Sequence, residues 1–411
     1  MKIGINASFV RKPDAGMGRV SANFLQKLAE TRVKSPSLKR GKQKLKVESS
    51  NFQFPNKEVE FFVYLEEDID WDLPENFHKR VFQPPYHRDD LIRKIWWEKF
   101  LLPKKVKKDG CDVFLSLYQC PTVFKGVPHI MLVHDAIWKI FPNYINNSRK
   151  RLYYKKVEKA IGKADKVMTI SESSKKDIQK FFGRKEKDII VNPIDCDPVF
   201  KKSLDQETKE KVLNGFELES GGYIFYVGGF DTRKNVEGLL RAYGMLWRKY
   251  SGKMKIPKLA IAGKFNPGLV PLITDLPGEI EQVCQEFSAP KENFIQLGFV
   301  EQADLPTLYQ EAKAFCFPSL YEGFGLPVLE AFNSGCPAVV SENSSLGEIA
   351  NRQNAFIFEN GSDEDLAEKL YECLKKDKKR KEKTEKARKD AEKYSWEGFV
   401  ENSLKELTSV K

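Results

Sequence analysis

Short apolar runs alternate with longer amphipathic stretches along nearly the whole chain. In the first half, the runs occupy residues 2–7, 59–64, 113–116, 129–133 and 166–170. Stretches with helical periodicity, such as 19–30 and 149–162, lie between them. Strands that alternate with helices predict a parallel sheet with crossover helices. This first series ends near Pro198.

A second series of the same kind begins after residue 200. Its strand-like runs are 223–227, 258–262, 294–297, 314–317, 338–340 and 355–358. A length of 411 residues also exceeds what one hydrophobic core usually serves. We therefore expect two α/β domains, residues 1–200 and 201–394. Because such sheets bind ligands beyond the carboxyl ends of their strands, two facing sheets would form an interdomain site.

The composition excludes several classes of protein. Hydrophobic residues make up 41% and charged residues 31%, and no apolar stretch approaches the roughly 20 residues that span a bilayer. The start of the chain resembles a strand rather than a secretion signal. The seven cysteines are scattered without C-x-x-C pairs, so neither a disulfide framework nor a zinc site is indicated. These features predict a cytoplasmic protein without a metal.

The positive charge is concentrated in the first domain. Residues 1–200 hold 39 basic and 25 acidic side chains, a net charge of +14, whereas the remainder holds 30 and 33, a net charge of −3. Residues 31–50 contain seven basic side chains and one acid, Glu48, and are expected to form a loop.

Basic and aromatic residues also interleave at 93–99 and 104–108. Such a face suits the headgroups of an anionic membrane. The alternative is a helix whose tryptophans belong to the core and whose lysines are merely solvated. No nucleic-acid-binding module is recognisable, so no nucleic-acid partner is expected.

Two segments of the first domain follow strands and could contact a ligand. Gly16 and Gly18 lie in the run Asp14-Ala15-Gly16-Met17-Gly18-Arg19, whose backbone N–H groups could receive a phosphate or let an acceptor approach; the alternative is a simple turn. His134 and Asp135 follow the run 129–133, where the imidazole could bind a sugar hydroxyl or be structural.

Arg233 and Lys234 follow the first strand of the second domain and are predicted to open the helix 236–246. Cations in the first turn of a helix oppose its dipole, so their presence indicates a bound anion. A diphosphate would be such an anion. The alternative is a pair of solvated side chains in a loop.

The richest segment is Tyr321-Glu322-Gly323-Phe324-Gly325-Leu326-Pro327, which follows the run 314–317. Pro327 favours a helix that begins near Leu326. The backbone N–H groups from Gly323 up to Pro327 would then form an anion site. Glu322 precedes this site, and Glu330 lies about one turn inside the helix, where it could bind ribose hydroxyls. A capping carboxylate and a surface glutamate are the alternative.

This segment resembles the E-x7-E signature of the family 4 retaining glycosyltransferases. Further resemblances occur in order over nearly the whole chain: Thr169-Ile170-Ser171-Glu172, Gly298-Phe299-Val300 with Asp304, Gly335-Cys336-Pro337, Ser345-Leu346-Gly347-Glu348 and Tyr394-Ser395-Trp396-Glu397. The resemblance implies the GT-B fold, two Rossmann-like doubly wound domains facing a cleft. It also implies that a C-terminal helix, residues 395–411, returns to the first domain.

The resemblance assigns roles to particular residues. The position of Glu322 binds hydroxyls of the donor sugar, that of Glu330 the ribose, and that of His134 the 6-hydroxyl region of the sugar. The basic pair Arg233 and Lys234 neutralises the diphosphate. The remaining implied donor contacts are Gly16, Gly18, Asp135, Val300, Gly323, Phe324, Gly325 and Leu326. Many members carry an arginine where this chain has Gly229, so Arg233 is expected to supply that charge.

The implied activity is a metal-independent, retaining hexosyltransferase that needs no cofactor. We expect a nucleotide-sugar donor, GDP-mannose by overall similarity to bacterial mannosyltransferases, and a lipid-linked or polysaccharide (oligosaccharide) acceptor at the inner membrane face. Alternatives are a UDP-sugar donor, a sugar-nucleotide epimerase or phosphorylase of the same fold, and a membrane-adhering binding protein without activity. The D-x-D spacing in 66–72 imitates a metal motif but follows a strand of a doubly wound sheet and lacks neighbouring ligands.

Overall fold

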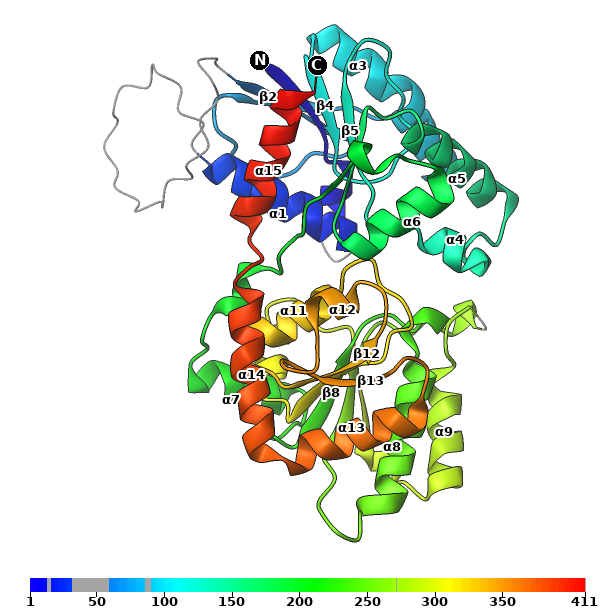
Figure 1. Cartoon of the computed structure of the whole chain (residues 1–411), viewed down its shortest axis with the longest axis vertical. Helices are drawn as coiled ribbons and strands as arrows, with labels where there is room; N and C mark the ends of the chain where they lie inside the picture. The colour runs from blue at the N-terminus through cyan, green and yellow to red at the C-terminus, as the bar shows by residue number, and fades with distance from the viewer. Residues whose placement is uncertain (13–15, 32–58, 86–89, 271, 411) are drawn as a thin grey trace. The chain divides into compact units, whose positions relative to one another are not determined.

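The computed structural model describes residues 1–12, 16–31, 59–85, 90–270 and 272–410. Asp14 and Ala15 of the first glycine segment lie outside the described residues, as does the basic loop from residue 32 onward. The chain divides into two compact units (Figure 1). The N-terminal unit comprises Met1–Ile194 and Tyr394–Lys411, and the C-terminal unit is Asp195–Lys393.

The N-terminal unit is built on a seven-stranded parallel sheet with the order β3-β2-β1-β4-β5-β6-β7. Its strands are β1 (Lys2–Asn6), β2 (Glu60–Leu65), β3 (Phe77–Val81), β4 (Val113–Ser116), β5 (His129–Leu132), β6 (Lys166–Thr169) and β7 (Ile189–Val191). The strand order reverses between β1 and β4, which makes their carboxyl ends the topological switch point of the sheet.

Five of these seven strands lie where the apolar pattern predicted them, within a few residues. The central strands β4 and β5 are buried along their whole length, and a strand covered on both faces appears as a continuous apolar run. The two strands that the pattern missed lie at the edges. In β3, with the sequence Phe-His-Lys-Arg-Val, only Phe77 is buried, and β7 has only three residues. Charged, short edge strands are common because they resist pairing with other chains.

The helices of this unit are α1 (Gly16–Glu30), α2 (Asp90–Trp96), α3 (Leu102–Asp109), α4 (Ile137–Ile140), α5 (Ser148–Ile161), α6 (Glu172–Phe182) and α15 (Trp396–Ser409). Short 3₁₀ turns η1 (Ser8–Arg11), η3 (Pro142–Tyr144) and η4 (Glu186–Asp188) and the π-helical turn η2 (Trp97–Leu101) connect them.

The C-terminal helix α15 packs within the N-terminal unit, beside α1 (Figure 1). Ser395 caps α15 by accepting a hydrogen bond from the Gly398 N–H. Asn192, at the end of β7, donates to the carbonyl oxygen of Phe399 at 2.9 Å and contacts the hydroxyl of Ser403 at 3.2 Å. The last segment of the chain therefore completes the unit that the first segment begins.

The C-terminal unit is built on a six-stranded parallel sheet with the order β10-β9-β8-β11-β12-β13. Its strands are β8 (Tyr223–Val227), β9 (Lys258–Ala262), β10 (Phe294–Gly298), β11 (Ala314–Phe317), β12 (Ala338–Glu342) and β13 (Phe356–Glu359). All six lie within two residues of the bounds predicted from the sequence. The switch point lies between β8 and β11.

Helices of the C-terminal unit are α7 (Gln206–Gly215), α8 (Val236–Tyr250), α9 (Leu276–Phe287), α10 (Leu305–Gln310), α11 (Leu326–Asn333), α12 (Leu346–Ile349), α13 (Asp363–Lys375) and α14 (Asp377–Ala391). The 3₁₀ turns are η5 (Pro198–Lys201), η6 (Thr232–Lys234), η7 (Pro267–Leu269) and η8 (Lys291–Asn293). α8 packs against both α9 and α13, and its buried face includes Leu239, Leu240, Tyr243 and Leu246.

Two further expectations can be compared with the structure. All seven cysteines are free thiols, and six of them are buried. Within the described ranges, no helix is long and apolar enough to cross a membrane.

The start of α1 depends on close backbone packing. A Cβ atom added at Gly18 would lie 1.8 Å from the carbonyl oxygen of Lys12, whereas one added at Gly16 would meet nothing within 4 Å. The missing side chain of Gly18 therefore makes room for the chain's own backbone. Its predicted contact with a donor stays a prediction.

We expect Gly18→Ala to destabilise the protein by several kcal/mol, because a backbone oxygen cannot move aside as a flexible side chain can. The matched variant Gly16→Ala should be neutral or stabilise by up to about 1 kcal/mol through better helix propensity. Urea unfolding of both variants measures the difference. Equal free energies of unfolding would show that α1 does not need this close approach.

Candidate functional site

The loop after β8 brings two cations to the switch point of the C-terminal unit. Arg233 and Lys234 belong to the 3₁₀ turn η6, and Asn235 follows in the left-handed region with φ 51°. Helix α8 begins only at Val236. The prediction that the two cations lie in the first turn of this helix is therefore wrong, because a left-handed residue separates them from it.

The carboxylate of Glu322 lies against both cations. Its Oε1 is 2.6 Å from Lys234 Nζ and 2.8 Å from an Arg233 guanidinium nitrogen. The hydroxyl of Ser319 donates to the same oxygen at 2.6 Å. The Lys234 ammonium also lies 4.9 Å from the centre of the Phe317 ring. In this structure the anion that the basic pair contacts is thus a side chain of the protein.

Burial opposes the ionisation of Glu322, which is 8% exposed, but Lys234 and Arg233 outweigh that effect and lower the pKa of the carboxyl. A buried charge is tolerated when it is paired and hydrogen-bonded, and removing one partner leaves the other uncompensated. Glu322 is therefore a carboxylate held ready to accept hydrogen bonds rather than an acid.

The same contacts fasten two loops together. The Leu320 N–H donates to the carbonyl oxygen of Arg233 at 2.7 Å, and an Arg233 guanidinium nitrogen donates to the carbonyl oxygen of Tyr321 at 3.1 Å. The loop after β8 and the loop after β11 consequently form one rigid support at the carboxyl ends of adjacent strands.

A cluster of small polar residues after β12 supports the Glu322 loop from its other side. The Ser345 hydroxyl lies 2.8 Å from the carbonyl oxygens of both Glu322 and Phe324. The Glu322 N–H donates to the Ser344 hydroxyl at 2.9 Å, and the Asn343 amide donates to the Ser319 carbonyl at 2.5 Å. These supporting roles were missed. The run Ser341-Glu342-Asn343-Ser344-Ser345 after a predicted strand was the available signal.

Helix α11 begins at Leu326, as predicted. Gly325 precedes it with φ 116°, and a Cβ atom there would lie 2.6 Å from Leu346 Cδ2, so only glycine fits. Gly323 and Phe324 are buried in the turn between Glu322 and this helix. Since the first N–H groups of a helix have no partner within it, this turn is a suitable place for a phosphate.

Glu330 lies inside α11 and is 3% exposed. The hydroxyl of Tyr309, from α10, donates to Glu330 Oε2 at 2.9 Å. Tyr309 itself is fully buried and packs edge-on against Phe225 and Phe315. The sequence could not pair Tyr309 with Glu330, because they belong to different helices. Val300, the predicted donor contact after β10, is buried at 7% exposure.

In the N-terminal unit, His134 directly follows Val133 at the carboxyl end of β5 and is 6% exposed. Burial lowers its pKa to about 4, with a hydrogen bond to Leu117 acting in the opposite direction. The ring is therefore neutral at physiological pH. Because Nε2 lies 3.0 Å from the Leu117 carbonyl oxygen, which can only accept, the proton is on Nε2 and Nδ1 is an acceptor.

The other predicted residues of this unit have local structural contacts. Asp135 accepts a hydrogen bond from the Ile137 N–H at 3.1 Å, at the start of α4. Gly16 opens α1 after β1 and η1. The structure thus brings Arg233, Lys234 and Glu322 into contact and adds the turn before α11, whereas His134, Asp135, Gly16 and Gly18 belong to the other unit. All donor-binding roles stay predictions.

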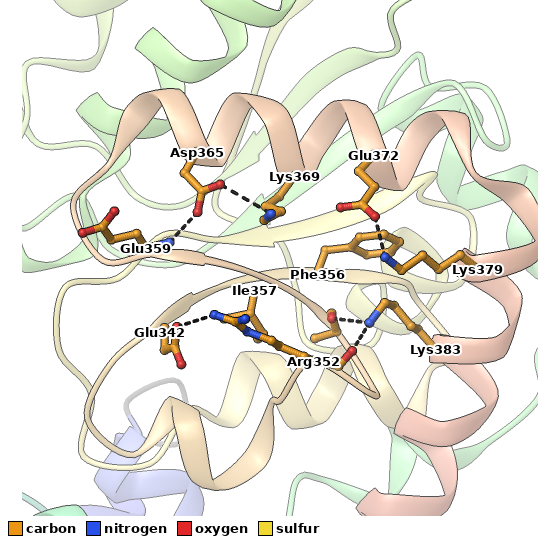
Figure 2. Close-up of a pocket in the computed structure, with 11 residues that line it drawn as sticks. Glu342, Arg352, Phe356, Ile357, Glu359, Asp365, Lys369, Glu372, Lys379 and Lys383 are labelled. Carbon is orange, nitrogen blue, oxygen red and sulfur yellow. Dashed lines mark hydrogen bonds and ion pairs between the residues drawn. The ribbon is translucent and has the colours of Figure 1, made fainter.

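A cavity of about 520 Å³ lies elsewhere in the C-terminal unit (Figure 2). It is bounded by β13, α13 and α14, and the ammonium of Lys383 points back to the carbonyl oxygens of Arg352 and Ala355. None of the predicted site residues lines it. Its acidic and basic side chains largely pair with one another, so it offers no set of groups for the predicted chemistry.

In the part of the chain that the structure describes, no group of three or more histidine, cysteine or acidic side chains is placed to hold a metal ion. Glu66, at the start of the acidic stretch after β2, instead pairs with Arg11 at 3.1 Å and with Arg93 at 2.9 Å. Asp68 pairs with Lys79 at 3.2 Å.

Two family models match the chain. "Glycosyl transferases group 1" matches residues 209–390, and "Glycosyltransferase Family 4" matches residues 56–198. Among curated relatives, "O-antigen chain mannosyltransferase B" from Escherichia coli is 28% identical over 70% of this chain and 73% of its own length.

Solved structures share the whole fold. WaaG, described as a glycosyltransferase involved in lipopolysaccharide biosynthesis, superposes with a TM-score of 0.69 at 17% identity and full coverage of both chains. Anabaena Alr3699/HepE in complex with UDP and glucose gives a TM-score of 0.69 at 16% identity, also with full coverage of both chains. At such identities these likenesses show the fold alone. The predicted GT-B fold of two Rossmann-like domains is confirmed.

We expect the free energy of unfolding to fall as the pH drops from about 6.5 toward about 4, because burial lowers the pKa of His134 to about 4 and that of His129 to about 3. Both histidines have a pKa near 6.5 in the unfolded chain, so unfolding takes up protons in this window and none above it. Urea unfolding at pH 7.5 and pH 5.5 measures the loss.

The matched variants are His134→Gln and His129→Gln, each of which should make the dependence on pH shallower by up to one proton. A variant pair whose unfolding free energy depends on pH as steeply as that of the wild type would contradict the assignment of two neutral, buried imidazoles.

Proposed function

We propose, from the premise that this chain belongs to glycosyltransferase family 4, that it transfers a hexose from a nucleotide sugar to a lipid-linked or polysaccharide acceptor with retention at the anomeric carbon. The observation that carries the proposal is the Glu322 carboxylate, held by Lys234, Arg233 and Ser319 beside the start of α11. Carboxylates bind sugar hydroxyls, and cations beside a helix start bind phosphates.

The preferred donor is GDP-mannose. Support comes from the mannosyltransferase relative, whose likeness extends over most of both chains. A UDP-sugar is the alternative donor, since one protein of the same fold was solved with UDP and glucose. That protein is only 16% identical, so the curated relative has more weight for the choice of donor.

In the proposed complex, Glu322 accepts hydrogen bonds from hydroxyls of the donor sugar. Arg233 and Lys234 bind the diphosphate through those of their N–H groups that do not hydrogen-bond to Glu322. Negative charge grows on the diphosphate as the anomeric C–O bond breaks, and cations that are already in place stabilise it without reorganisation. Glu330, oriented by Tyr309, binds the ribose hydroxyls and holds the nucleoside in place.

The neutral His134 would accept a hydrogen bond from a hydroxyl of the sugar, in the 6-hydroxyl region, through Nδ1. A front-face attack is proposed for the transfer, in which an oxygen of the donor phosphate takes the proton of the acceptor hydroxyl. The acceptor oxygen bonds to the anomeric carbon as the bond to the diphosphate breaks. The step uses neither a metal nor a cofactor, and the protein positions the reacting groups.

The proposed place of action is the cytoplasmic face of a membrane, with peripheral contact through the basic N-terminal unit. Support comes from the net charge of +14 in residues 1–200. A lipid-linked acceptor would be presented at such a surface.

We expect Glu322→Gln to lower the rate of transfer about 100-fold or more, with nucleotide affinity changed by less than about threefold, since the proposal places this side chain against the sugar rather than the nucleoside. Glu330→Gln should instead weaken binding of the nucleoside diphosphate itself by about tenfold, because a neutral amide is a poorer acceptor for ribose hydroxyls. Transfer rates and calorimetric binding of the nucleotide separate the two effects.

The control is Glu342→Gln, which alters a more exposed glutamate of the same unit that pairs with Arg352. It should retain both rate and affinity. If Glu322→Gln and Glu330→Gln both behaved like this control, the assignment of the site would be wrong.

We expect GDP and GDP-mannose to raise the melting temperature more than UDP, ADP or their sugars, because a ligand stabilises the folded state in proportion to RT ln(1 + [L]/Kd). A thermal-shift panel at matched concentrations measures this. Equal shifts for all three nucleotides would contradict the choice of GDP. Product analysis with and without an acceptor then distinguishes a transferase from an epimerase.

A further inference from the structure

One surface of the N-terminal unit combines exposed apolar side chains with unpaired lysines; we call it the α2–α5 face. Its apolar residues are Ile92 and Trp96 on α2, Phe100 on the π-helical turn η2, and Leu152 on α5. They are 40%, 44%, 49% and 50% exposed, which places them among the most exposed large apolar side chains of the described residues. The helices α2 and α5 that carry most of them pack against each other.

The two adjacent tryptophans of this segment have opposite environments. Trp97 is 1% exposed, stacks on Phe82 with ring centres 5.1 Å apart and donates its indole N–H to the Phe82 carbonyl oxygen at 2.8 Å. Trp96 points the other way and contacts the ring of Phe100, 6.5 Å between centres. The sequence left open whether the tryptophans belong to the core or face a membrane. The core alternative holds for Trp97, whereas Trp96 is exposed and its contact with a membrane stays a prediction.

Spacing explains the exposed apolar row. Ile92, Trp96 and Phe100 are four residues apart, so they follow one another along one side of the helical segment. Because Trp97 and Leu102 anchor the opposite side in the core, this segment cannot rotate to bury the row. The fold therefore leaves the apolar rings of Trp96 and Phe100 in contact with water, which is unfavourable.

Four lysines lie on the same elements as the exposed apolar residues: Lys99 on η2 and Lys155, Lys156 and Lys159 on α5. The Lys99 ammonium lies 5.0 Å from the centre of the Phe100 ring. No ion pair among the described residues includes any of the four. Partial burial and, after it, the positive charges of Lys99, Lys159 and Lys155 lower the pKa of Lys156.

We propose that the α2–α5 face docks on a bilayer that contains anionic phospholipids, with Trp96 and Phe100 inserted at the headgroup level and the four lysines bound to lipid phosphates. Tryptophan and other amphipathic rings favour the boundary between headgroups and acyl chains. Lysines close to a negatively charged leaflet contribute about 1 kcal/mol each. A bilayer provides both an apolar layer and a sheet of anions, and so relieves the exposure and the repulsion together.

A protein partner is the main alternative occupant. Typical protein interfaces are depleted in lysine and place charges at the rim. Here Lys99 contacts the exposed ring of Phe100 itself, which is the arrangement of a membrane-surface helix. The proposal rests on the proposed function for its biological setting but depends on no property of the donor site.

The test is cosedimentation of the full chain with vesicles of phosphatidylcholine alone and of phosphatidylcholine with phosphatidylglycerol. We expect binding to the anionic vesicles and little to the neutral ones. Replacing the four lysines of the face by glutamine should weaken this binding at least tenfold. Failure of the wild-type chain to bind anionic vesicles would overturn the proposal.

The matched control replaces four exposed lysines of the C-terminal unit, Lys375, Lys378, Lys381 and Lys389, by glutamine. This variant carries the same change in net charge and should bind nearly as well as the wild type. If it loses as much binding as the variant of the face, general charge attraction accounts for the result and the proposal fails.

A second measurement locates the contact. Lipids with brominated acyl chains quench tryptophan fluorescence over short distances, so bound wild-type protein should be quenched through Trp96. Trp96→Phe should still bind but lose most of the quenching, whereas Trp96→Ser with Phe100→Ser should bind at least tenfold less. Quenching that persists in Trp96→Phe would place another tryptophan at the bilayer and overturn the assignment.

These vesicle experiments need no donor, and transfer to a soluble acceptor analogue needs no vesicle. Loss of vesicle binding with intact transfer would reject only the docking surface. Vesicle binding without transfer from any nucleotide sugar would reject only the proposed function.

Discussion

The buried carboxylate of Glu322 is the constraint on which the C-terminal unit depends. Burial alone would make its charge unfavourable, and Lys234, Arg233 and Ser319 compensate for this by pointing at a single oxygen atom. Satisfying that charge requires the loop after β8 and the loop after β11 to lie together. One local electrostatic requirement thereby determines the geometry of the switch point.

The proposed binding of a nucleotide sugar at this site would need no large rearrangement. The cations are already oriented, and Ser344 and Ser345 hold the Glu322 loop so that the start of α11 faces the same region. Positioned dipoles and charges lower a barrier most when they need not move during the reaction. A diphosphate would share the cations with Glu322, which links recognition of the sugar to stabilisation of the leaving group.

The N-terminal unit has a different electrostatic character. Burial lowers the pKa of His134 and keeps its ring neutral, so it can form hydrogen bonds but carries no charge to neutralise a phosphate. Unpaired positive charge lies instead on the surface, beside the exposed rings of Trp96 and Phe100. The cations paired with Glu322 are those that we propose to bind the donor, and the lysines of the α2–α5 face are those that we propose to bind a bilayer.

The sequence by itself determined the fold class and most strands, because central strands of parallel sheets are continuous apolar runs. It also determined the start of α11, since the fixed φ of Pro327 suits the first turn of a helix. The edge strands β3 and β7 were not predicted, because β3 is charged and β7 is very short. Only the tertiary structure decided which groups meet: Glu322 with Lys234, Tyr309 with Glu330, Trp97 inward and Trp96 outward. Such pairings depend on how separate elements pack, and periodicity along one segment contains no information about its neighbours in space.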